Sequence, residues 1–130
     1  MHAPANDLIQ LFVDKTFDAH MLAALVGAHT CSRQFTQDLT RVRATQDSTP
    51  GIWDVRFYNE TIQKPPRKKL FIFESDLALA AHPDIQVEWN MFINDQSHWN
   101  EVCVAPFLPY VEIDLGAFAD YCTRISRRLT

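Results

Sequence analysis

Apolar residues recur at helical intervals in several short segments of the chain. The most regular segment begins after Asp18, whose side chain is suited to cap a helix. Its inward positions follow the spacing i, i+3, i+4 and i+7 at Leu22, Leu25, Val26 and His29. The pattern therefore predicts a helix that carries a histidine on its buried apolar stripe.

The same periodicity, read with capping residues and prolines, predicts further short helices. Their expected ranges are Asn6 or Asp7 to near Lys15, 52–63, Ser75 or Asp76 to Ala81, Pro83 to Ile93, Ser97 to about Cys103, and 117–127. Residues 32–50 are polar and predict an ordered loop or short ribbon, and residues 69–73 a short extended piece. We therefore expect one mainly α domain over residues 1–130, with about five to seven short helices and little β structure.

His29 and Asp76 form the first candidate pair. A lone histidine on an apolar helix face is more often a core residue than a ligand, and an aspartate that starts a helix is more often a cap. However, Asp76 lies in the loop-to-helix turn Glu74-Ser75-Asp76-Leu77, from which a carboxylate can reach an imidazole Nδ1. Such a bond selects the tautomer and makes the other ring nitrogen a stronger donor to a metal.

A second candidate site is the segment Asp47-Ser48-Thr49-Pro50-Gly51-Ile52-Trp53-Asp54, which begins eighteen residues after His29. Its carboxylates and hydroxyls are hard oxygen donors, and the Pro-Gly turn allows them to converge on one calcium ion. The alternative is an ordinary polar turn before a helix that begins near Asp54, and composition by itself favours that turn.

Composition and motifs exclude several classes of function. Lys+Arg number 12 against 16 Asp+Glu, and the scattered basic residues do not predict nucleic-acid binding; the run Arg67-Lys68-Lys69 reads as a solvated loop. The three cysteines lack the CxxC spacing of a zinc site and do not predict a disulfide framework. No glycine loop for phosphate, nucleophile elbow or HExxH motif is present. No apolar segment approaches the roughly 20 residues that cross a bilayer, so no membrane is expected as a partner.

The stretch Met21-Leu22-Ala23-Ala24-Leu25-Val26-Gly27-Ala28-His29-Thr30-Cys31, the segment 47–54 and Asp76 together resemble the proximal half of a fungal class II haem peroxidase. The resemblance runs from about Leu8 to Cys122 and implies a partial haem-peroxidase-like helical domain, truncated, without the distal half. It implies that His29 is the axial ligand of a haem b cofactor and that Asp76, as a catalytic residue, hydrogen-bonds to it. The implied calcium ligands are Thr30, Asp47, Thr49, Ile52 through its carbonyl oxygen, and Asp54.

The chain also departs from the pattern of this family. Ala24 stands where ligninolytic members place a tryptophan, and Phe35 where manganese-oxidising members place a carboxylate. No segment resembles the Arg-x-x-Phe-His stretch that carries the distal histidine and arginine. We therefore expect a haem on His29 to be open on one face unless a homodimer or a second polypeptide covers it. Residues 1–14 lack the features of a secretory signal and predict a cytoplasmic chain, although the family is secreted.

Three hypotheses for function follow, each with a small-molecule substrate or none. The first is a haem-binding oxidoreductase fragment with little peroxidase turnover of its own. The second is a haem-independent cyclase or isomerase of secondary metabolite biosynthesis, built on a repurposed peroxidase scaffold. The third is a non-catalytic remnant. The intact proximal motif favours the first hypothesis, and the missing distal half favours the second.

Overall fold

The computed structural model describes residues 4–104 of the chain, with side chains through residue 102. The helical elements in this range are α1 (Ala5–Val13), α2 (Ala19–Val26), η1 (Gly27–Cys31), η2 (Leu39–Arg41), α3 (Arg56–Ile62), α4 (Glu74–Ala81), α5 (Pro83–Phe92) and α6 (Gln96–Val104), where η denotes a 3-10 helix. β structure within 4–104 is limited to one antiparallel bridge between Arg33 and Thr45. The mainly α expectation is confirmed, and the helix expected over 117–127 lies outside the described residues. Within that same range, none of the helices has the length and apolarity needed to span a bilayer.

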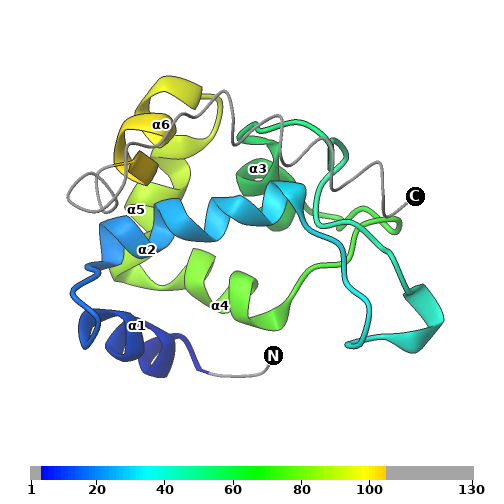
Figure 1. The fold of residues 1–130 in the computed structure, drawn as a ribbon, viewed down its shortest axis with the longest axis horizontal. Coiled ribbons are helices and arrows are strands. Elements are labelled where there is room, and N and C mark those ends of the chain that lie inside the picture. Colours follow the sequence, from blue (N-terminus) through cyan, green and yellow to red (C-terminus); the bar gives the residue numbers. More distant parts are fainter. Residues whose placement is uncertain (1–3, 105–130) are drawn as a thin grey trace.

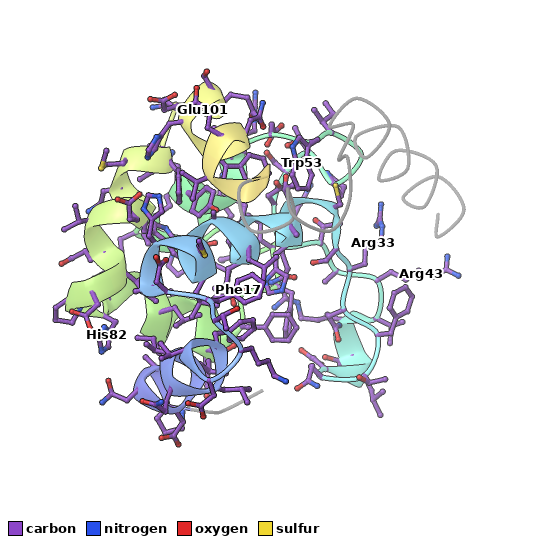
Figure 2. All side chains as sticks on the ribbon, turned by 60° about the vertical axis from the view of Figure 1, so that its left-hand side comes forward. Phe17, Arg33, Arg43, Trp53, His82 and Glu101 are labelled. Atoms are coloured by element: carbon purple, nitrogen blue, oxygen red, sulfur yellow. The ribbon has the colours of Figure 1, made fainter. Side chains whose placement is uncertain are left out.

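Helix α2 runs through the middle of the molecule, and the other elements are arranged around it (Figure 1). It packs against α5 and α6 on one side and against α1 on another, while η1 at its C-terminal end contacts α3. The part of the 32–50 loop that contains η2 extends away from the helices, whereas its last residues return to them. Figure 2 shows Arg33 and Arg43 of this loop at the opposite edge of the molecule from His82. The central helix therefore brings His29 to the junction between the helices and the loop.

Local capping explains where several helices begin. Asp18 caps α2 as predicted, because its carboxylate accepts a hydrogen bond from the backbone N–H of Met21 at 2.8 Å. Pro83 occupies the first turn of α5, where its missing N–H leaves no bond unmade, and the preceding His82 caps that helix. Helix α1 begins directly after Pro4, slightly before the predicted cap.

Two helix boundaries and one extended segment differ from the prediction. The helix expected from residue 52 begins only at Arg56, because Asp54 turns its carboxylate to the Arg56 N–H at 3.0 Å and keeps the preceding residues in a loop. The last described helix is capped by Asp95, which accepts from the His98 N–H at 3.0 Å, and not by Ser97. Residues 69–73 form no strand. Residues 32–50, predicted as an ordered loop or short ribbon, form a loop with one antiparallel bridge between Arg33 and Thr45.

The centre of the core holds aromatic side chains of α3, α5 and α6, with aliphatic residues of α2 and α4 packed around them. The ring of Tyr58 lies 5.1 Å from that of Trp89 and 6.0 Å from that of Trp99, and all three residues are fully buried. The Tyr58 hydroxyl donates to the carbonyl oxygen of Ala23 at 2.7 Å, and the Trp99 indole N–H donates to that of Ala24 at 2.8 Å. The Trp89 indole N–H donates to the carbonyl oxygen of Tyr58 at 3.0 Å, so the polar groups of all three side chains are satisfied. The bonds of Tyr58 and Trp99 also hold the C-terminal half of α2, and hence the position of His29.

Gly27 sits where this core leaves no room for a side chain. Its dihedral angles, φ -57 and ψ -19, are those of an ordinary right-handed turn, so the backbone would accept alanine. An added Cβ would lie 2.7 Å from the Trp99 Nε1 atom and closer still to the Tyr58 hydroxyl. Neither group can retreat without losing its hydrogen bond to α2. We expect Gly27→Ala to lower the free energy of unfolding, measured in urea, by about 2–4 kcal/mol.

The matched control is Ala28→Gly, which removes a methyl group from the next, half-buried position of the same turn. It should cost about 1 kcal/mol or less, since only helix propensity changes. A Gly27→Ala protein as stable as wild type would contradict this expectation, because it would show that Tyr58 and Trp99 can move to make room for the added methyl group.

Candidate functional site

His29 lies in η1, the turn that continues α2. The His29 side chain lies beside Leu22, Leu25 and Val26, on the apolar face where the spacing predicts it. It is 36% exposed and not buried as expected, because this face forms the wall of a cavity.

This cavity, called the His29 cavity below, lies among α1, α2 and α4 and has a volume of about 430 Å³. Its size falls within the range of small-ligand sites, roughly 300–1,000 Å³. Its lining is apolar except for His29, Ser75 and Asp76. The lining residues are Leu8, Leu11, Phe12, Leu22, Leu25, Val26, His29, Phe73, Ser75, Asp76 and Leu79. The cavity therefore combines an apolar wall with one imidazole and one carboxylate.

The predicted pairing of His29 with Asp76 is present. Asp76 lies in the first turn of α4, is 2% exposed, and places its Oδ2 atom 2.9 Å from the His29 Nδ1. An ionised carboxylate only accepts hydrogen bonds, so the imidazole proton resides on Nδ1 and the lone pair on Nε2. The rings of Phe57 and Phe73 pack against the imidazole at centroid distances of 5.6 and 5.9 Å. Hydrogen bonding and packing thus fix both the tautomer and the ring orientation.

Gln46 is a member of this site that the sequence did not indicate. Its side chain is 1% exposed, and its amide nitrogen donates to the Asp76 Oδ2 at 3.0 Å and lies 3.3 Å from the His29 Nδ1. Its amide oxygen accepts a hydrogen bond from the Ser32 hydroxyl. A glutamine within a polar loop has no sequence signal that marks it as buried, so only the fold reveals the contact.

Residues of the predicted calcium site also come together, around Thr30 of η1, and none of them lines the His29 cavity. The Thr30 hydroxyl contacts an Asp47 carboxylate oxygen, and lies 3.4 Å from both the Ile52 carbonyl oxygen and the Asp54 Oδ1. The Thr49 hydroxyl donates to the Asp54 Oδ2 at 2.7 Å. The five residues thus surround one point with carboxylate, hydroxyl and carbonyl oxygens, the donor types that calcium takes.

Ser48, one of the oxygen donors of the loop, turns away from this point. Its backbone N–H and its hydroxyl donate to the two carboxylate oxygens of Glu60, at 2.7 and 2.5 Å. Glu60 is 4% exposed and anchors the loop to α3, a role that its position within an apolar helix did not suggest. Ser48 is therefore a structural residue of the loop.

The carboxylates of Asp47 and Asp54 give this cluster negative charge. The described residues place no cationic side chain beside Asp47 to balance it. Burial, with smaller contributions from the nearby Asp54 and Glu60 carboxylates, raises the pKa of Asp47 to about 7, although hydrogen bonds from Thr30 and from the Thr49 N–H act to lower it. Within residues 4–104 no group of three His, Cys, Asp or Glu side chains converges for a metal, and this cluster has two carboxylates with neutral oxygens. A hard divalent cation would supply the missing positive charge, so the donor set fits calcium.

Comparison with known proteins places these residues in a family. A family model for peroxidase matches residues 1–95, a range that includes both the His29–Asp76 pair and the oxygen cluster. The low-redox potential peroxidase of Taiwanofungus camphoratus is 32% identical to the chain over 108 residues, which is 72% of this chain. The chain spans 33% of the length of that relative. The chain therefore belongs to the peroxidase family.

Proposed function

We propose that the chain is a haem-binding oxidoreductase fragment in which His29 ligates the iron of haem b. One observation carries the proposal: the hydrogen bond between His29 Nδ1 and Asp76 leaves the Nε2 lone pair available beside an apolar cavity. The residues present fit the group, since a haem requires both a neutral imidazole and an apolar wall. When bound, the haem would supply redox chemistry at its iron.

The side chains around His29 would control how strongly the imidazole donates. Asp76 keeps the proton on Nδ1 and increases the basicity of the ring, which strengthens the bond from Nε2 to a metal. Gln46 donates to the same carboxylate oxygen that faces His29 and so draws part of its charge away. Phe57 and Phe73 pack against the ring and restrict its rotation.

We infer further that a calcium ion is held by Thr30, Asp47, Thr49, the Ile52 carbonyl and Asp54. Thr30 directly follows His29 and is fully buried against Asp47. A cation at this point would tie the loop of residues 47–54 to η1, and its role would be to hold the histidine in place.

The experiment that tests the haem proposal is a titration of the purified chain with haemin, followed by absorption in the Soret region. We expect a shifted and sharpened Soret band that saturates at one haemin per chain. Asp76→Asn should weaken haem affinity by about 10- to 100-fold, because loss of the carboxylate that hydrogen-bonds to a metal-ligating histidine reduces affinity on this scale. A spectrum that stays that of free haemin throughout the titration would contradict the proposal.

A separate prediction concerns turnover. These 130 residues contain no Arg-x-x-Phe-His stretch to provide the acid–base histidine and the charge-stabilising arginine. We expect the chain, loaded with haem, to oxidise phenols with peroxide little faster than free haemin does. Activity that rises with chain concentration, or on addition of a second polypeptide, would indicate that a homodimer or partner completes the site. Conversion of a small molecule without haem or peroxide, undiminished by His29→Ala, would favour the cyclase or isomerase hypothesis instead.

A further inference from the structure

A second cavity, called the basic cavity below, lies on the other side of α4 from His29. Its volume is about 540 Å³, and it shares no lining residue with the His29 cavity. The segment before α4 separates the two, because the extended backbone points Ile72 into the basic cavity and Phe73 into the other. Nothing in the haem proposal depends on this second cavity.

Positive charge is concentrated around the basic cavity. Four of the chain's 12 lysines and arginines line it, namely Arg41, Lys64, Arg67 and Lys68, and no acidic residue does. The chain as a whole carries a formal net charge of -4. The fold thus brings Arg41 of η2 together with Lys64, Arg67 and Lys68, which follow it by 23 or more residues in the chain. Lys69, the next residue, does not line the cavity.

The two arginines are held in place. The Arg41 guanidinium donates to the carbonyl oxygens of Lys68 and Leu70, at 3.0 and 2.6 Å, and lies over the Phe71 ring at 5.8 Å. These contacts use only part of its five N–H donors. Arg67 is oriented by a hydrogen bond to Gln63 at 3.2 Å and by an ion pair with Glu60 at 3.5 Å, which offsets part of its charge. Because the guanidinium groups are already ordered, less side-chain entropy is lost when they bind an anion.

The two lysines remain available. Among the described residues, no hydrogen bond or ion pair engages the ammonium group of Lys64 or Lys68. The cavity also has an apolar part of its lining, called its floor below, formed by Ile62, Leu70, Ile72 and Leu77. Leu77 is 44% exposed there, although it belongs to a helix whose other face is buried.

We propose that the basic cavity binds a small organic anion, with an apolar body on the floor and a phosphate or carboxylate group between the lysines and arginines. Its volume suits a compact molecule of this type. Charged groups bind such anions through short, charge-assisted hydrogen bonds, and an ordered guanidinium adds orientation. An apolar floor contributes affinity that a free inorganic anion cannot use.

Isothermal titration calorimetry of the haem-free chain tests the proposal with 1-naphthyl phosphate, 1-naphthoate, 1-naphthol and inorganic phosphate. We expect one of the two naphthyl anions to bind at one per chain, about tenfold or more tighter than naphthol and than inorganic phosphate. Preference for the phosphate assigns a phosphate monoester as the ligand class, and preference for the carboxylate assigns a carboxylic acid.

Two variants locate the site. Lys64→Gln combined with Lys68→Gln should weaken binding of the preferred anion about tenfold. Lys69 is also exposed but does not line the cavity, so Lys69→Gln should change the affinity by no more than about twofold. Melting curves of the three proteins confirm that they are folded. If the double variant and Lys69→Gln lose the same affinity for the anion, the attraction is non-specific electrostatics and the proposal is overturned. Binding unchanged by the double variant, or naphthol bound as tightly as the anions, would overturn it as well.

Discussion

Replacing His29 by glycine should abolish the Soret shift that haemin gives with the wild-type chain, and added imidazole should restore it. The substitution removes the donor nitrogen but leaves a space beside Asp76 that a free imidazole can fill. Asp76 would accept the N–H of the added imidazole as it accepts that of His29, so the rescued spectrum should match that of wild type. The measurement is an absorption titration of the variant with haemin, with and without imidazole.

His20→Gly is the matched control for this experiment. The His20 side chain is 41% exposed, close to the 36% of His29. However, His20 pairs with Glu88 at 2.7 Å and does not line the His29 cavity. This variant should bind haemin as wild type does. Haem binding that survives His29→Gly without imidazole, or that is lost equally in His20→Gly, would assign the ligand to another residue.

Calcium should raise the melting temperature of the chain by about 10 °C when present at a hundred times its dissociation constant, and chelation should reverse the effect. At that ratio, linkage predicts about 2.7 kcal/mol of stabilisation, which corresponds to a shift of this size in a domain of about 100 residues. The measurement is a thermal melt followed by circular dichroism in EDTA, in calcium and in magnesium. Asp47→Asn should remove the response, whereas the exposed Asp84→Asn should retain it.

The calcium response should also depend on pH. Burial raises the pKa of Asp47 from 3.8 in the unfolded chain to about 7 in the folded one, so the folded state holds the extra proton between these values. Without calcium, the free energy of unfolding therefore falls as the pH rises from 4 to 7. Calcium must displace this proton at pH 5 but not at pH 8, and its stabilisation should be larger at pH 8. In EDTA, Asp47→Asn should flatten this pH dependence. A calcium shift that is equal at both pH values would contradict the assignment of Asp47.

Local patterns were sufficient to predict much of the helical framework. Asp18 caps α2 and Pro83 begins α5 because capping and the missing proline N–H act between residues that are neighbours in the chain. The apolar periodicity likewise identified the helices that bury Phe57, Trp89 and Trp99. The sequence offered His29 and Asp76 as a candidate pair, but only the family resemblance joined them, since no local rule connects residues 47 positions apart.

Tertiary structure decided the features that depend on contacts between distant segments. Gln46 is buried against His29 and Asp76, and Ser48 turns to Glu60, because folding of the 32–50 loop onto η1 and α3 sets which polar groups lose water and need partners. His29 is 36% exposed because its apolar face lines a cavity among three helices, which the apolar spacing did not reveal. Gathering Arg41 and three residues of the 64–68 segment around one cavity likewise requires the fold, because electrostatic fields depend on distance in space and not on separation along the chain.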